Sequence, residues 1–255
     1  QAGLSTRSIS SPNEPRWFRL LCLSLVVCVV SPLGGRYAYF EAVMDIEHFL
    51  KKRVRFANNF HEQGCKPFQE VMRLIEQKEA PYEPVYDESG DPQFIHEWLE
   101  ARDGVESIGL ATLSMLSSAL QLYMNAWLNR IEKKSSPFNR KCGKGWLNSL
   151  KKCMQDAGVD FSNCPADLEA IEQLVLARNR TQHVEDITSN TVSHMAKELA
   201  RFPSPLFVDS EDLALKANWF GQPKVYAGKH QITTISQEIV DFCEWLFFEY
   251  ERIYA

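Results

Sequence analysis

The sequence contains no Cys-x-x-Cys pair, no glycine-rich phosphate-binding loop and no internal repeat. Its seven cysteines stand singly, although Cys142, Cys153 and Cys164 recur at a regular interval. Zinc motifs pair their cysteines closely, and disulfide scaffolds pack many cysteines into a short chain. Neither pattern is present, so we expect buried free thiols, no metal site and no cofactor.

An excess of positive charge is also missing. The chain has 28 Lys and Arg against 33 Asp and Glu, a formal net charge of −5. Residues 1–43 hold four Arg and two Glu, a net +2, so the remainder carries −7. A body of this sign does not attract nucleic acid over its whole surface, so any contact with RNA must be local.

The first 43 residues differ from the rest of the chain. An apolar run, Leu20–Val30, follows Arg16 and Arg19 and has the length of a signal-peptide core, too short to span a bilayer. An amphipathic pattern then opens at Met44. Residues 1–43 are therefore interpreted as an upstream extension or a signal-like leader. We expect a cytoplasmic protein that has no membrane partner.

Residues 44–92 are expected to form a helical pair and a linker. Apolar residues recur at intervals of three and four over Met44–Gln63 and again over Pro67–Glu79, as two amphipathic helices require. A turn-rich segment, Ala80–Pro92, contains three prolines and a glycine. We place a domain boundary there.

Residues 93–255 have the pattern of a helical bundle. The clearest helix is predicted around 105–131, where one face has apolar residues at helical spacing. Further helices are predicted at Gly145–Ala157, from Pro165 onward, and at Ile235–Tyr254, the last opened by a capping box of Thr234 and Gln237. Residues 203–234 are mixed and rich in Pro and Gly, which indicates an insertion with a short hairpin at Lys224–Ile232. The fold class expected is all-α.

The most informative segment is the run Arg178–His183, at the end of the helix that begins near Pro165. Arg binds phosphate in a forked geometry and His moves protons near neutral pH, and RNA carries its own nucleophile, the 2′-hydroxyl. The same Arg-to-His pattern occurs at Arg55–His61, so spacing alone decides nothing. Asn179 distinguishes the later run, because an apolar Phe56 stands at the corresponding position of the earlier one.

Helix geometry limits how Arg178 and His183 could meet. Five residues turn a straight α-helix by about 500°, which leaves the two side chains roughly 140° apart. Either the helix ends between them, or a second copy of the chain completes the pair across a two-fold axis. Asn179 and His183 are four residues apart and share a face.

The run Arg178, Asn179 and His183, late in a helical domain, resembles the signature of the HEPN family. The resemblance covers roughly residues 93–255, and Val105–Ile131 and Ile235–Tyr254 are similar to the family's long early helix and its closing helix. It implies a HEPN-like helical bundle, a homodimer, and metal-independent endoribonuclease activity of the toxin–antitoxin or phage-defence type. It also implies a neutralising or regulatory protein as a partner. Where some relatives carry a modified Tyr, this chain has Glu185.

The resemblance also implies roles for single residues. Arg178 would stabilise charge on the scissile phosphate, His183 would move a proton, and Asn179 would orient His183 or a phosphate. Arg180 is expected to touch the RNA backbone, and Glu106, on a facing helix, to fix an imidazole tautomer. The alternative is a catalytically inert bundle for dimerisation or partner binding, in which Arg178 only caps a helix end. Arg55 and His61 are interpreted as a solvated helix face.

Overall fold

The computed structural model describes residues 35–86, 92–134, 137–140, 143–182, 191–209, 212 and 222–254, with side chains from residue 46 onward. The chain divides into two compact units, Gln1–Glu41 and Ala42–Ala255. Of the first unit only the residues from Gly35, the first turns of helix α1, are described. Everything that follows concerns the second unit, and His183 lies outside the described residues.

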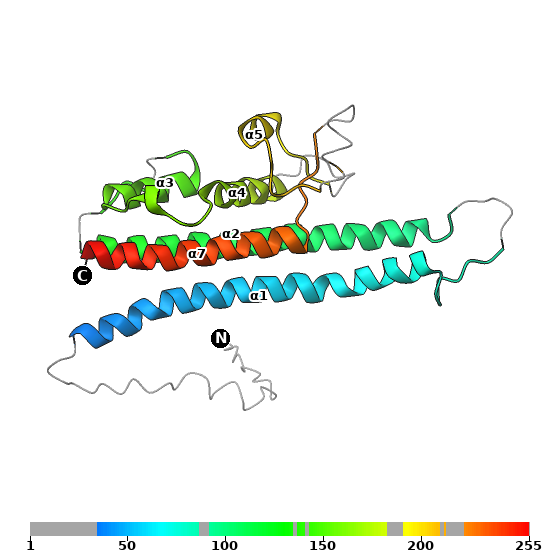
Figure 1. The fold of residues 1–255 in the computed structure, drawn as a ribbon, viewed down its shortest axis with the longest axis horizontal. Helices are drawn as coiled ribbons and strands as arrows, with labels where there is room; N and C mark the ends of the chain where they lie inside the picture. Colours follow the sequence, from blue (N-terminus) through cyan, green and yellow to red (C-terminus); the bar gives the residue numbers. More distant parts are fainter. Residues whose placement is uncertain are drawn as a thin grey trace, which may run out of the picture. The chain divides into compact units, whose positions relative to one another are not determined.

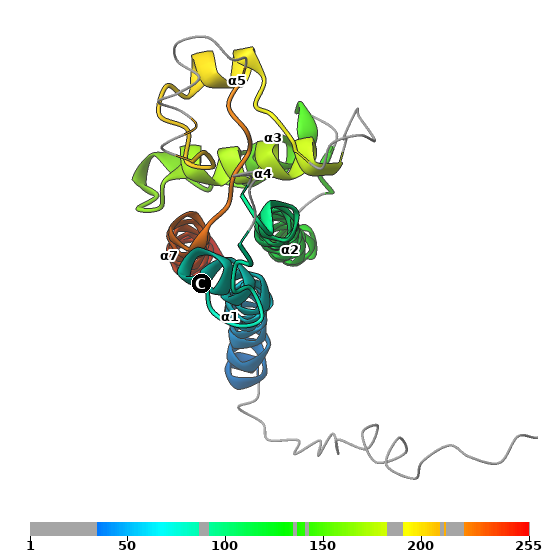
Figure 2. The ribbon, with the colours of Figure 1, turned by 90° about the vertical axis from the view of Figure 1, so that its right-hand side faces the viewer.

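The second unit is built from helices in three layers. In Figures 1 and 2, α2 and α7 lie side by side, with α1 on one side of them and α3 and α4 on the other. The bounds of the helices are α1 Gly35–Gln77, α2 Ile95–Glu132, α3 Gly145–Asp156, η2 Phe161–Asn163, α4 Leu168–Gln182, α5 Ala196–Arg201 and α7 Lys229–Tyr254. No strand occurs among the described residues, whose one β-type pairing is the bridge Ser193–Lys224. The all-α class is confirmed.

Helix α2 is the centre of the core. Its predicted apolar face is confirmed: Leu113, Leu116, Leu120 and Trp127 are fully buried, because neighbouring helices pack against α2 from several sides. Within the described residues α2 is also the one helix long and apolar enough to cross a membrane by length and composition. The central helix of a soluble bundle passes the same test, so this property does not indicate a membrane span.

The predicted helical pair in residues 44–92 is wrong. One continuous helix, α1, runs through both segments and contains Pro67 in its interior. Proline removes one backbone hydrogen bond and costs about 3 kcal/mol in a helix interior. Burial of Leu50, Val54 and Ala57 in the same core cluster as α2 offsets that cost. These residues therefore belong to the same compact unit as the bundle, Ala42–Ala255.

The hairpin predicted at Lys224–Ile232 is also wrong. Helix α7 begins at Lys229, inside the expected hairpin and ahead of the predicted capping box at Thr234. The segment before α7 is irregular, and its backbone is held by bonds to distant segments, such as Val225 N to Val192 O at 2.6 Å and Tyr226 N to Phe207 O at 3.0 Å. Pairing with those segments leaves no partner strand for a local hairpin.

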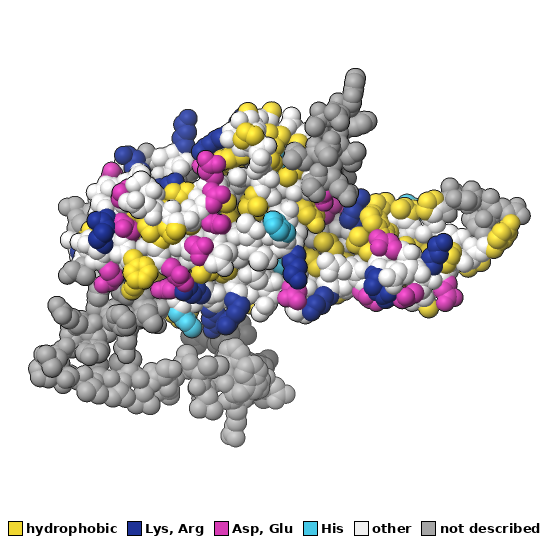
Figure 3. All heavy atoms as spheres, in the orientation of Figure 1, with side chains coloured by type: hydrophobic (Ala, Val, Ile, Leu, Met, Phe, Trp, Pro, Cys, Tyr) yellow, Lys and Arg dark blue, Asp and Glu magenta, His cyan; other side chains and the backbone are white. Residues whose placement is uncertain are grey.

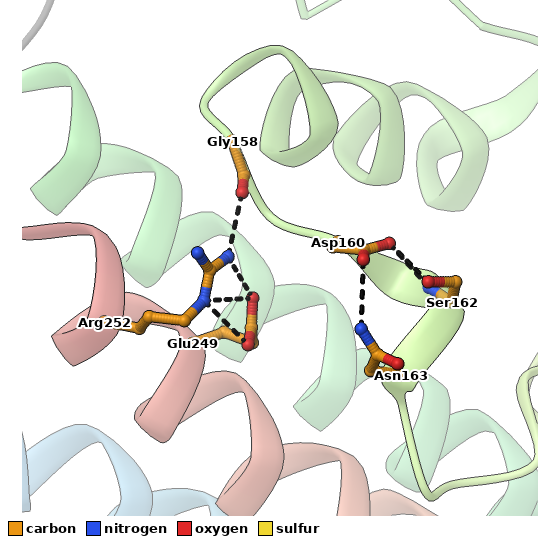
Figure 4. Close-up of polar contacts among 6 residues, drawn as sticks. All are labelled: Gly158, Asp160, Ser162, Asn163, Glu249 and Arg252. Atoms are coloured by element: carbon orange, nitrogen blue, oxygen red, sulfur yellow. Dashed lines mark hydrogen bonds and ion pairs between the residues drawn. The ribbon is translucent and has the colours of Figure 1, made fainter.

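The end of α7 is tied to the turn after α3 (Figure 4). Gly158 has a φ of 96°, a left-handed conformation that glycine adopts without strain. Its carbonyl accepts a bond of 3.2 Å from Arg252 Nη2, and the same guanidinium faces Glu249. The hydrogen bond that Glu249 accepts from Arg252 lowers the pKa of the Glu249 carboxyl group. Nearby, the Asp160 carboxylate accepts bonds from Ser162 and Asn163, and the Ser162 bonds lower the pKa of Asp160.

Asp167 sets the start of α4. Its Oδ1 accepts bonds from the backbone N–H groups of Glu169 and Ala170, at 2.9 and 3.1 Å, as an N-cap side chain does. Its own N–H donates to Glu238 Oε2 of α7 at 2.6 Å. The cap therefore positions the helix that carries Arg178 against α7.

Candidate functional site

The run Arg178–His183, called the α4 run below, has its described part in the last turn of α4. Ala170, Ile171, Leu174 and Val175 bury one face of this helix against the bundle. Helical structure continues to Gln182, so Arg178, Asn179 and Arg180 all lie on helix α4. The negative end of the helix dipole favours cations at this position.

Arg178 lies on the core-facing side of α4. It follows Leu174 by four residues, which places both on the same face, and its side chain is half-buried. Nη1 donates a hydrogen bond of 3.0 Å to Asn179 Oδ1. Nε is buried and has no hydrogen-bond partner among the described residues. Among the described residues the guanidinium is thus held by one amide, and its Nε is without a partner.

Neither Arg178 nor Arg180 faces a carboxylate within the described parts of the chain. Arg180 Nε donates instead to the Ser193 carbonyl at 3.3 Å, which links α4 to the segment that precedes α5. Other arginines of the molecule do form ion pairs, namely Arg73 with Glu70, Arg102 with Glu106, Arg140 with Glu132, Arg201 with Glu172 and Arg252 with Glu249. Arginine guanidinium groups bind carboxylates and phosphates alike in a forked, two-bond geometry.

Glu106 has a partner on its own helix. Its Oε1 lies 3.7 Å from Arg102 Nε, one turn earlier on α2. Burial, followed by the charges of Asp209 and Glu106, raises the pKa of Tyr226. Glu106 makes no contact with the described part of the α4 run, so its expected role beside His183 stays a prediction.

The interpretation of Arg55 and His61 as a solvated helix face is wrong for His61. Only 5% of His61 is exposed. Its ring Nε2 lies 3.8 Å from Cys65 Sγ, and it forms a hydrogen bond with the backbone of Ala227. Burial lowers the pKa of His61, because the charged imidazole loses its hydration. Arg55, on the other hand, is exposed as expected.

Sequence reasoning missed the burial of His61 because the residues that cover it, around Ala227, lie far along the chain. The residues before α7 approach α2 so closely that a Cβ on Gly109 would lie 2.3 Å from the carbonyl oxygen of Ala227. A glycine within the predicted apolar face of α2 was the available signal, since glycine permits such close approach. The lack of a side chain at Gly109 therefore lets the segment around Ala227 approach α2 and cover His61.

Two hollows lie outside the α4 run. A groove of about 620 Å³ lies between α4 and α7 and is lined by Asp167, Gln173, His230 and Glu238 among others. A smaller one, about 270 Å³, separates α1 from α2 and is lined mainly by apolar side chains. In the described ranges no group of three or more His, Cys, Asp or Glu is placed to hold a metal ion.

Comparison with known proteins gives no match. The chain matches no protein-family model, and no curated protein and no solved structure matches it. The geometry of the α4 run is therefore the basis for a functional assignment, and the HEPN resemblance stays a prediction.

Proposed function

We propose that this protein is a metal-independent endoribonuclease that acts as a homodimer, of the toxin or defence type, with the α4 run as its site. The observation that carries the proposal is the pair of half-buried guanidinium groups, Arg178 and Arg180, neither of which faces a carboxylate in the described chain. Such groups match the negative charge of a phosphodiester.

Each side chain has a definite chemical part in the proposal. Arg178 binds the non-bridging phosphate oxygens and stabilises the charge that develops on them. His183 takes the proton of the 2′-hydroxyl or donates one to the leaving 5′-oxygen. Asn179, already bonded to Arg178, holds the guanidinium in place. The products are a 2′,3′-cyclic phosphate and a 5′-hydroxyl, so atoms and charge balance without a metal ion or cofactor.

The experiment is an assay of purified protein on labelled RNA in the presence of EDTA. The wild type is expected to cut the RNA and leave a 2′,3′-cyclic phosphate end. Arg178→Ala and His183→Ala are each expected to lower the rate at least about a hundredfold. Arg201→Ala is the matched control, because Arg201 is a surface arginine of α5 that pairs with Glu172 of α4, the helix that carries Arg178. Cutting that persists in both variants would remove this site from consideration.

Mixing the inactive variants tests the homodimer. If the site is shared across a two-fold axis, Arg178→Ala and His183→Ala subunits complement each other and restore part of the activity. If each chain supplies a whole site, the mixture stays inactive. Before the assay the two variants are denatured, mixed and refolded together, so that their subunits exchange.

A second candidate function is an inert bundle that dimerises or binds a partner. The observation that favours it is that residues of the run form hydrogen bonds with one another. Arg178 Nη1 donates to Asn179 Oδ1, and the Arg178 carbonyl accepts from Thr181 Oγ1 at 2.8 Å. In this case RNA is not cut, and Arg178→Ala lowers only the stability of the last turn of α4. Thermal unfolding of the variant, measured beside the RNA assay, separates the two functions.

A further inference from the structure

Helix α1 has two unlike flanks beside its buried stripe. At 100° per residue, Phe49, Phe56 and Phe60 lie within about 40° of one another, roughly a third of a turn from the buried Leu50 and Val54. Phe49 is 54% and Phe56 63% exposed, although phenylalanine side chains are normally buried. The opposite flank is polar, and its Lys51 binds Glu244 of α7 at 2.7 Å.

The aromatic flank borders the hollow between α1 and α2. This hollow is lined by Ile46, Phe49, Leu50, Arg53, Ala119, Leu122, Tyr123 and Ala126. Leu122, on α2, is 55% exposed. Figure 2 shows α2 and α7 on opposite sides above α1, so the hollow lies on the side of α1 away from α7. We call the set Phe49, Phe56, Phe60 and Leu122 the aromatic face.

The described charged side chains at the edges of the aromatic face are cations. On α1, Lys52 and Arg53 stand at its two edges, and neither forms an ion pair in the described part of the chain. The one acid of α1 between Ile46 and His61 is Glu47, which lies 2.6 Å from Lys51 on the other flank. Helix α2 has no charged residue between Glu106 and Arg130. The face drawn in Figure 3, by comparison, mixes Lys and Arg with Asp and Glu.

We propose that the aromatic face binds the surface of an anionic lipid membrane, with the phenylalanines in the acyl region and Lys52 and Arg53 at the head groups. Helices that lie in a membrane interface combine an aromatic or aliphatic face with flanking cations. A hollow lined by aliphatic side chains accepts a hydrocarbon chain, and Arg53 at its rim meets a phosphate. This inference is independent of the proposed nuclease function and departs from the expectation that the protein has no membrane partner.

Two other occupants fit the face less well. In a two-fold pairing with a second copy, the edges that carry Lys52 and Arg53 would be brought close to those of the other copy, so like charges would meet. Single-stranded RNA can stack its bases on phenylalanine rings, but its base edges also need polar partners, which the hollow supplies poorly. The hollow has an aliphatic wall, and the hydroxyl of Tyr123 already donates to the Cys243 carbonyl at 2.8 Å.

The test is sedimentation of the full chain with phosphatidylcholine vesicles, with and without phosphatidylglycerol. Binding is expected to need phosphatidylglycerol and to weaken with added salt. Phe56→Ser and Leu122→Ser are each expected to lower the partition coefficient about tenfold, because each removes an inserted apolar side chain. Lys52→Gln combined with Arg53→Gln should lower it about twentyfold.

Matched controls keep the result specific to this face. Phe248→Ser removes a phenylalanine of α7 that is 68% exposed, and it should change binding less than about twofold. The apolar run Leu20–Val30 is present in every variant, so only differences between variants report on the aromatic face. Circular dichroism confirms that each variant is folded.

Three results would overturn the proposal. The first is equal binding to neutral and anionic vesicles, and the second is unchanged binding by both Phe56→Ser and Leu122→Ser. The third assigns another occupant: Phe56→Ser abolishes a concentration-dependent dimer or the gel shift of an RNA oligonucleotide but leaves vesicle binding intact. RNA cleavage is measured separately, so loss of vesicle binding with normal cleavage, or the reverse, tells the two proposals apart.

Discussion

The molecule contains two runs in which an arginine precedes a histidine, and the fold treats them in opposite ways. In the α1 run, Arg55 is exposed and His61 is buried beneath the backbone of Ala227. In the α4 run, Arg178 is half-buried on the core-facing side of its helix, beside Asn179. Both arginines lack a carboxylate partner among the described residues, but only Arg178 is held in place by a hydrogen bond.

The difference shows that the spacing of Arg and His in the sequence does not predict a site until the residues that surround each side chain are known. A histidine that is to move protons must be able to exchange its charge with solvent or substrate. Burial lowers the pKa of His61 and shields its ring from solvent, while Arg55 is exposed. In the α4 run, the buried Nε of Arg178 has no hydrogen-bond partner among the described residues. The following predictions test this contrast.

The largest effect is expected on RNA cleavage. Arg178→Ala should lower the rate at least about a hundredfold, because a positioned cation at the phosphate is lost. Arg55→Ala should leave the rate within about twofold, since that side chain is exposed on another helix. Initial rates on one labelled RNA, with EDTA present, compare the two variants directly. Equal losses in both would mean that charge in general, rather than the α4 run, matters.

The next effect concerns the cover over His61. Gly109→Ala should destabilise the protein by about 1–3 kcal/mol, because the new methyl group meets the Ala227 carbonyl, a backbone atom. Gly104→Ala is the matched control on the same helix: its methyl group meets only the ring of Phe68, a partly exposed side chain that can move. That control should be neutral or more stable by up to about 1 kcal/mol, as the helix propensity of alanine implies. Urea unfolding of both variants measures the difference.

A smaller effect is the pH dependence that His61 contributes. Its folded pKa lies below the usual value of 6.5, so the unfolded chain binds the proton first as the pH falls. The free energy of unfolding should therefore decrease below pH 6.5 and level off below the folded pKa. The carboxylates with lowered pKa values, such as Glu132 and Glu249, lose their contribution only at more acidic pH. Unfolding at about pH 8 and about pH 5 measures the slope, which His61→Leu should reduce.

The smallest effect is expected at the ion pair beside the candidate site. Arg201 binds Glu172 of α4 through two contacts, of 2.5 and 2.6 Å, but the arginine is mostly exposed. Exposed pairs contribute at most about 1 kcal/mol, so Arg201→Ala should change stability by less than that and leave cleavage unchanged. A large loss of cleavage in this variant would show that the position of α4, and not Arg178 itself, controls activity.

Most of the helices could be predicted from local pattern, while their ends could not. The apolar spacing around Leu113 and Trp127 indicated α2, and Asp167 stood where α4 needs its cap. Pro67 is a strong local signal for a helix end, yet α1 continues through it, with Gly64 close to Ile108 of α2 and Phe68 close to Gly104 of α2. The early start of α7, at Lys229, follows from backbone bonds between distant segments, which no local pattern contains.

The sequence by itself determined the all-α class, the amphipathic face of α2 and the clustering of Arg178, Asn179 and Arg180 at one helix end, because helical periodicity is a local property of the chain. Only the tertiary structure decided that His61 is buried, that Arg178 faces the core and bonds to Asn179, and that phenylalanines of α1 remain exposed. The reason is physical: burial depends on which segments meet, and the residues that cover or expose a side chain lie far from it in the sequence.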